Sequence, residues 1–200
     1  NLETKGFDVK KSLILIPTLL VCFSNFIYLL FINDEFHVSF SSILVFEIVL
    51  LAVKALNEEI IFRLVLLNNL ESESKLKNIL ISSAVFAAMH IINFVNGISV
   101  AVLLQVLYTF GLGLLFGVIF YFSGSLIPCV VGHVLFNVMN NSVFNAINTG
   151  SNMLTYILVN VGVALVVVIY VIVILFVKKE IIFKEEEALW SAKLVWSWMN

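Results

Sequence analysis

Six long apolar segments constrain this chain more than any other feature of its sequence. They run over roughly 12–32, 41–69, 77–95, 99–122, 125–146 and 152–177, with only short connections between them. Each reaches about 20 residues, the length that an α-helix needs to cross a bilayer. Continuous apolar runs satisfy their backbone hydrogen bonds in lipid as helices, not as the alternating strands of a barrel. We therefore expect an all-α fold, a polytopic membrane bundle of about six transmembrane helices with a conical or cavity-containing core.

The composition excludes several other classes of protein. The 200 residues are 62% hydrophobic and 12% charged, whereas soluble domains are about 45–50% apolar and about 25% charged. A net charge of −2 with no basic stripe excludes a nucleic-acid partner. Cys22 and Cys129 lie in apolar runs without disulfide or metal spacing, so we expect two small buried hydrophobes. Neither a repeat nor a linker divides the chain, which predicts a single membrane domain over 1–200.

The basic residues predict the orientation of the bundle. Of the 11 Lys and Arg residues, all but Lys54 and Arg63 lie before the first span, between the second and third, or after the last. The segments 33–40, 96–98 and 147–151 carry none. Because Lys and Arg accumulate in cytoplasmic loops, both termini and the 70–76 loop are predicted to be cytoplasmic. The tail 178–200 holds all three tryptophans, which favours an interfacial amphipathic helix or a partly disordered segment.

Several ionisable or polar side chains lie inside the predicted spans, where they are costly and tend to mark function. At about 1.5 Å of rise per residue, Glu58, His90 and His133 fall within about 8 Å of one another in height. Three helices thus bring an acid and two imidazoles to one level, as in a site built in a bundle core. For the remaining polar residues we expect structural or lumen-facing roles: Glu47, Lys54, Asn93, Gln105 and Asn160.

Spacings of four residues place further groups on the same helix faces. They join Glu59 to Arg63, Phe86 to His90, and His133 to Asn137. Phe86 is expected to shield the site and limit rotation of the imidazole. An alternative is structural, because a buried ion pair can fix helix packing and a lone membrane histidine is often a packing hydrogen-bonder.

These residue types suit the hydrolysis of an amide. A poorly hydrated carboxylate can act as a general base on water. Neutral histidines can bind a divalent metal, polarise a carbonyl or donate hydrogen bonds, and an asparagine N–H can stabilise an oxyanion. No serine or cysteine nucleophile accompanies the set, and the HExxH pattern of a zincin is absent.

Three motifs occur in order, each in its own apolar segment. Residues 58–63 read EExxxR, residues 86–90 read FxxxH, and residues 133–137 read HxxxN. Over about 42–145 the chain resembles the CAAX-protease and bacteriocin-processing (CPBP, or Abi) family of intramembrane endopeptidases, in its bacterial branch. The resemblance implies that Glu58 is the base that activates water and that His90 positions this water. It also implies that His133 and Asn137 donate hydrogen bonds to the oxyanion, with Glu59 and Arg63 as supporting residues. It also leaves open a metalloprotease with Zn²⁺ or another divalent ion on Glu58, His90 and His133.

The resemblance implies a hydrolase similar to CAAX prenyl protease type 2, acting on a peptide or membrane-protein substrate near the cytoplasmic face of a bacterial plasma membrane. The alternative is a non-proteolytic bacteriocin immunity or membrane-protein-binding module with the same fold. A small transporter is a third class, against which the absence of an internal repeat argues. Gly113 and Gly117 favour close packing within a monomer over a homodimer.

Overall fold

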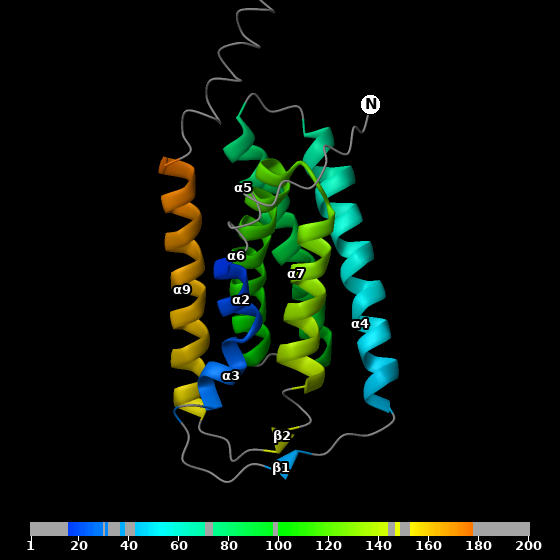
Figure 1. Cartoon of the computed structure of the whole chain (residues 1–200), viewed down its shortest axis with the longest axis vertical. Coiled ribbons are helices and arrows are strands. Elements are labelled where there is room, and N and C mark those ends of the chain that lie inside the picture. The colour runs from blue at the N-terminus through cyan, green and yellow to red at the C-terminus, as the bar shows by residue number, and fades with distance from the viewer. Residues whose placement is uncertain are drawn as a thin grey trace, which may run out of the picture.

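The computed structural model describes residues 16–29, 31, 37–38, 43–70, 74–97, 100–143, 147–148 and 153–177. Its helices run side by side along the long axis of the molecule (Figure 1). The α-helices are α2 (Ile16–Cys22), α3 (Ser24–Leu29), α4 (Ile43–Glu59), α5 (Lys75–Met89), α6 (Val100–Ser123), α7 (Ile127–Asn137) and α9 (Met153–Val177). The predicted all-α bundle is therefore confirmed.

Three helices change type along their length. Helix α4 continues into the π-helix η2 (Ile60–Leu67), α5 into the 3₁₀-helix η3 (His90–Asn96), and α7 into the π-helix η4 (Val138–Val143). Each change falls at a sequence motif, because α4 ends at Glu59, η3 begins at His90 and α7 ends at Asn137. Such local changes of helix type are frequent at functional sites.

Within the described part of the chain, three helices are long and apolar enough to cross a membrane, over Lys75–Val95, Val102–Ser123 and Leu154–Ile174. The other expected spans differ from this pattern for identifiable reasons. The first expected span is broken at Phe23, between α2 and α3. The second carries five charged side chains, and the apolar helix Ile127–Asn140 is shorter. The total of six spans stays a prediction, and the tail 178–200 lies outside the described residues.

A pair of two-residue strands, which the sequence did not predict, joins two connections. Strand β1 (His37–Val38) is antiparallel to β2 (Ile147–Asn148), with His37 opposite Asn148. Both strands lie at the same end of the bundle (Figure 1). The pairing thus joins the connection after the first expected span to the connection before the last, which the alternating direction of the spans predicts to lie on the same side of the membrane.

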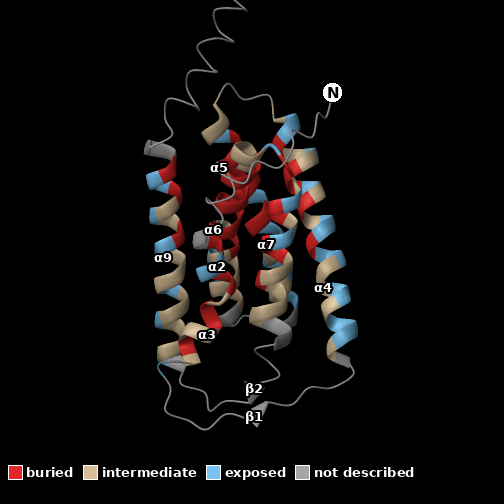
Figure 2. Ribbon diagram, viewed as in Figure 1, coloured by how far each residue is buried: buried red, intermediate tan, exposed pale blue. Residues whose placement is uncertain are grey.

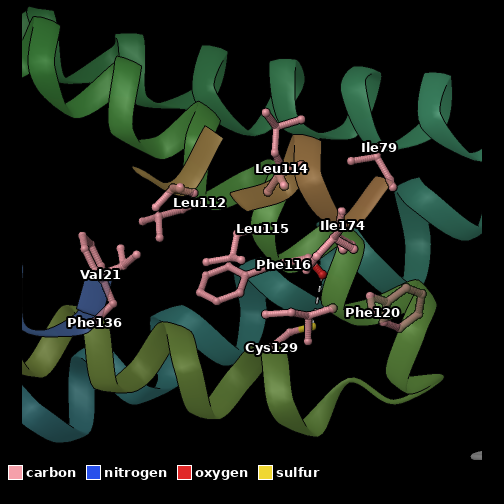
Figure 3. Close-up of a cluster of buried hydrophobic side chains, with 14 of the residues drawn as sticks. Val21, Ile79, Leu112, Leu114, Leu115, Phe116, Phe120, Cys129, Phe136 and Ile174 are labelled. Atoms are coloured by element: carbon pink, nitrogen blue, oxygen red, sulfur yellow. Dashed lines mark hydrogen bonds between the residues drawn. The ribbon is translucent and has the colours of Figure 1, made fainter. Parts of the chain in front are cut away.

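Helix α6 supplies much of the buried core, which Figure 3 shows in close-up. A Cβ atom at Gly113 would lie 2.9 Å from the Ser83 Cβ atom, and one at Gly117 would lie 3.0 Å from Ile79 Cγ2. These two glycines therefore let α6 approach α5 within one chain, as predicted. Both cysteines are free and buried, also as predicted.

The outward surface of the bundle is largely apolar. Buried residues gather on the inward faces, while α4 and α9 show many exposed positions (Figure 2). Large exposed apolar side chains on these two helices include Val45, Phe46, Leu154, Leu158 and Ile169. Extended apolar surfaces of this kind mark contact with a membrane. The protein is an integral membrane protein on these grounds and on the length of its apolar helices.

Candidate active site

One cavity of about 180 Å³ brings the predicted catalytic residues together. Glu58 reaches it from the end of α4, and His90 from the junction of α5 and η3. His133 and Asn137 reach it from α7, one helical turn apart. Phe86 also lines the wall. Three segments far apart in the sequence thus contribute complementary polar groups to one space inside the bundle.

The imidazole of His133 is held between two carboxylates. Its Nδ1 atom lies 2.8 Å from Glu59 Oε1, and its Nε2 atom lies 3.5 Å from Glu58 Oε2. The Glu59 side chain is fully buried, whereas that of Glu58 is 18% exposed. An Nδ1–H donated to Glu59 fixes the ring and leaves Nε2 for the cavity, which is the orienting role that carboxylates play beside catalytic histidines.

Arg63 lies behind this pair and outside the cavity lining. Its Nε atom donates to Glu59 Oε2 at 3.0 Å, and its Nη1 atom donates to Ser82 Oγ at 3.3 Å. Ser82 in turn donates its hydroxyl to the Phe62 carbonyl at 2.9 Å. The guanidinium therefore compensates the buried carboxylate and links η2 to α5, which places Glu59 and Arg63 one layer behind the cavity wall.

Aromatic rings surround the two imidazoles. The Phe86 ring meets His90 edge to face at a centroid distance of 5.1 Å and His133 at 5.9 Å. Phe116 stacks on His133 at 5.5 Å. His90 is fixed further because its Nδ1 atom lies 2.9 Å from the Phe86 carbonyl oxygen. An Nδ1–H donated to that carbonyl leaves a lone pair on Nε2 of the neutral ring. Phe86 thus restricts both imidazoles.

The cavity wall includes polar residues outside the motifs. Lys54 lies there with its Nζ atom 3.7 Å from Glu58 Oε1, and Gln105, Tyr108 and Thr109 lie there on α6. The spacing of these last three, i, i+3 and i+4, places them on one face of an otherwise apolar helix. That pattern was available in the sequence, whereas the contact between Glu59 and His133 links residues 74 positions apart and had no local signature.

The predicted metal ligands line the cavity without forming a metal centre. Among the described residues, no three His, Cys, Asp or Glu side chains gather closely enough to hold an ion. Both ring nitrogens of His133 lie beside carboxylates that compete for them. In this geometry Glu58, His90 and His133 do not fit a three-ligand site, and Zn²⁺ or another divalent ion stays a prediction.

The fold and the cavity together define a class of protein, an integral membrane helical bundle with a buried cluster of carboxylates and imidazoles. Residues 40–139 match the family model described as type II CAAX prenyl endopeptidase Rce1-like. The match covers half the chain and contains all three motifs, so the chain belongs to this family. Membership implies a protease. Comparison with curated proteins and with solved structures found no match.

Proposed function

We propose that this protein is an intramembrane endopeptidase that hydrolyses a peptide bond near the cytoplasmic membrane face. The observation that carries the proposal is the single cavity lined by Glu58, His90, His133 and Asn137. At about 180 Å³ it can admit water, and its polar groups supply the partners that an enclosed water needs. Hydrolysis inside a bilayer requires such a compartment, because hydrocarbon supplies no nucleophile.

In the first step Glu58 acts as the general base. Its side chain is partly exposed on the cavity wall. The lone pair on His90 Nε2 accepts one hydrogen bond from the attacking water and so orients it. The other O–H bond of the water breaks, its proton passes to the Glu58 carboxylate, and the oxygen forms a bond to the scissile carbonyl carbon.

In the second step the oxyanion is stabilised and the leaving group departs. As the new C–O bond of the first step forms, the carbonyl π electrons move to the carbonyl oxygen, where His133 Nε2–H and the Asn137 side-chain N–H donate hydrogen bonds. A protonated His133 ring keeps its Nδ1–H for Glu59 while Nε2–H serves the oxyanion. Collapse of the tetrahedral species then breaks the C–N bond, and the leaving nitrogen takes the proton from Glu58. The products are a carboxylic acid and an amine, and the Glu58 carboxylate is restored.

The same proposal places the protein in a bacterial plasma membrane as a monomer, with both termini in the cytoplasm and a peptide or membrane protein as substrate. The distribution of Lys and Arg supports this orientation. Tags at the two ends should resist protease in intact spheroplasts and be digested after lysis. Digestion of either tag in intact spheroplasts would contradict the orientation.

The activity is testable with purified protein in liposomes that hold a library of membrane-anchored peptides. We expect cleavage by the wild type and its loss in His90→Ala, with helicity and gel-filtration profile unchanged. Cleavage by His90→Ala at the wild-type rate would contradict the role of this residue. A chelator arm tests the metal, because loss of activity that added Zn²⁺ restores would support a bound ion. In cells, bacteriocin protection that survives Glu58→Ala would instead support the immunity module.

A further inference from the structure

Helix α6 carries a polar face on an otherwise apolar span. The segment Val102–Ser123 has a mean hydropathy of 2.2. Gln105, Tyr108 and Thr109 nevertheless share one face, and all three line the cavity that holds Glu58 and His90. A polar side chain in a membrane helix is costly unless it has a hydrogen-bonding partner. This face therefore needs hydrogen-bonding partners, which the protein, cavity water or a ligand that displaces that water can supply.

Only half of the Gln105 amide has a partner in the described part of the chain. Asn93 Nδ2 donates to Gln105 Oε1 at 2.9 Å, and the described residues accept no hydrogen bond from Gln105 Nε2. Asn93 lies three positions after His90 in the 3₁₀-helix η3, where residues i and i+3 eclipse. Asn93 thus anchors Gln105 on the same side of η3 as His90.

A peptide backbone is the ligand class that fits the N–H donors of Gln105 Nε2. This step rests on the proposed function, because a peptide that is to be cut must enter the cavity extended, with its carbonyl and N–H groups unpaired. Those groups need partners inside a membrane protein as much as the protein's own backbone does. We infer that Gln105 is a substrate-binding residue whose Nε2 donates to a backbone carbonyl of the extended peptide, with Asn93 holding the side chain in place.

A merely structural Gln105–Asn93 tie between α6 and η3 makes a different prediction. Removing such a tie lowers stability without changing the affinity for a peptide. Two substitutions separate these roles. Gln105→Met keeps an unbranched chain of similar length and removes the amide, while Gln105→Glu keeps an oxygen for Asn93 and removes both N–H donors. Asn160→Leu is the matched control, because Asn160 is a half-buried amide on α9 that donates to Tyr156 O at 2.9 Å within its own helix and does not line this cavity.

The experiment measures KM and kcat on one peptide that the wild type cleaves, with the protein in liposomes. It also measures the Kd of the same fluorescently labelled peptide in the Glu58→Gln background, where no turnover interferes. We expect both Gln105 variants to raise KM and Kd by about 5- to 10-fold, with kcat within about twofold of the wild type, since one neutral hydrogen bond to the substrate is lost. Asn160→Leu should leave both constants unchanged.

The possible outcomes separate this inference from the proposed function. Unchanged KM and Kd in folded Gln105→Met and Gln105→Glu would overturn the inference and leave the protease intact. An equal rise in Asn160→Leu would also overturn it, because the effect would then follow from any lost membrane amide. Absence of cleavage by the wild type against every peptide would instead overturn the proposed function.

Discussion

Helix α4 and the π-helix η2 carry two acid–cation pairs with the same four-residue spacing and opposite surroundings. Lys54 Nζ lies 3.7 Å from Glu58 Oε1, and these side chains are 58% and 18% exposed. Arg63 Nε lies 3.0 Å from Glu59 Oε2, and both of these side chains are fully buried. The two pairs therefore allow a matched comparison of Lys54→Met and Arg63→Met within one continuous helix.

The expected costs differ by several kcal/mol. Lys54 and Glu58 line the cavity that admits water. A solvated ion pair contributes about 0–1 kcal/mol, so Lys54→Met should lower the free energy of unfolding by no more than about 1 kcal/mol. Removing one partner of a buried pair costs about 3–5 kcal/mol, because the other charge stays buried without its counter-ion. In Arg63→Met, Glu59 keeps only its hydrogen bond with His133. Arg63→Met also takes the donor away from Ser82 Oγ. We therefore expect Arg63→Met to be destabilised by at least about 3 kcal/mol.

The assay is reversible unfolding in mixed micelles, followed by circular dichroism while the fraction of denaturing detergent is raised. Equal losses of stability in Arg63→Met and Lys54→Met would contradict a larger contribution from the buried pair. The double variant Glu59→Gln/Arg63→Met supplies a second check, because it removes both charges of the buried pair. It should be more stable than Arg63→Met alone, and an additional loss of stability would contradict the buried Glu59 charge as the cause.

Two further predictions use neighbouring or chemically identical positions as controls. Ser82→Ala breaks the hydrogen bonds to Arg63 and the Phe62 carbonyl and should cost about 1–3 kcal/mol in the same unfolding assay. The control Ser83→Ala should cost less, because the Ser83 hydroxyl donates to Ile79 O in its own helix. A larger cost for Ser83→Ala would contradict the stabilising link that Ser82 makes between η2 and α5. Gly113→Ala should lower the thermal midpoint of unfolding because its Cβ atom would meet Ser83 at 2.9 Å. The control Gly162→Ala should raise the midpoint or leave it unchanged, because no atom lies within 4 Å of the added Cβ atom. Equal losses in the two variants would contradict the close packing of α6 on α5.

Local patterns in the sequence predicted much of the architecture and the site. Apolar runs of membrane-spanning length led to a helical bundle because helix length and bilayer thickness are fixed quantities. The rise per residue was enough to predict that Glu58, His90 and His133 lie at one level, and the structure places them around one cavity. The four-residue spacing also predicted the ion pair of Glu59 with Arg63.

Other features depend on tertiary contacts and could not be predicted from the sequence. The first expected span breaks at Phe23, beside Asn140 of η4. The Nδ2 atom of Asn140 donates to the Cys22 carbonyl at 2.8 Å, and its Oδ1 atom accepts from the Asn25 backbone N–H at 3.0 Å. These bonds satisfy backbone groups that a continuous helix would pair internally. The changes of helix type at the motifs similarly have no local pattern in the sequence.

In the proposed mechanism Glu58 activates the water that cleaves the peptide. The most direct test compares cleavage by Glu58→Gln and Glu47→Gln in the same liposomes, because Glu47 is an exposed carboxylate on the same helix that does not line the cavity. We predict that Glu58→Gln lowers kcat by about 10²- to 10⁴-fold, the usual contribution of a general base, while Glu47→Gln keeps the wild-type rate. A folded Glu58→Gln protein that cleaves the peptide at the wild-type rate would contradict the account.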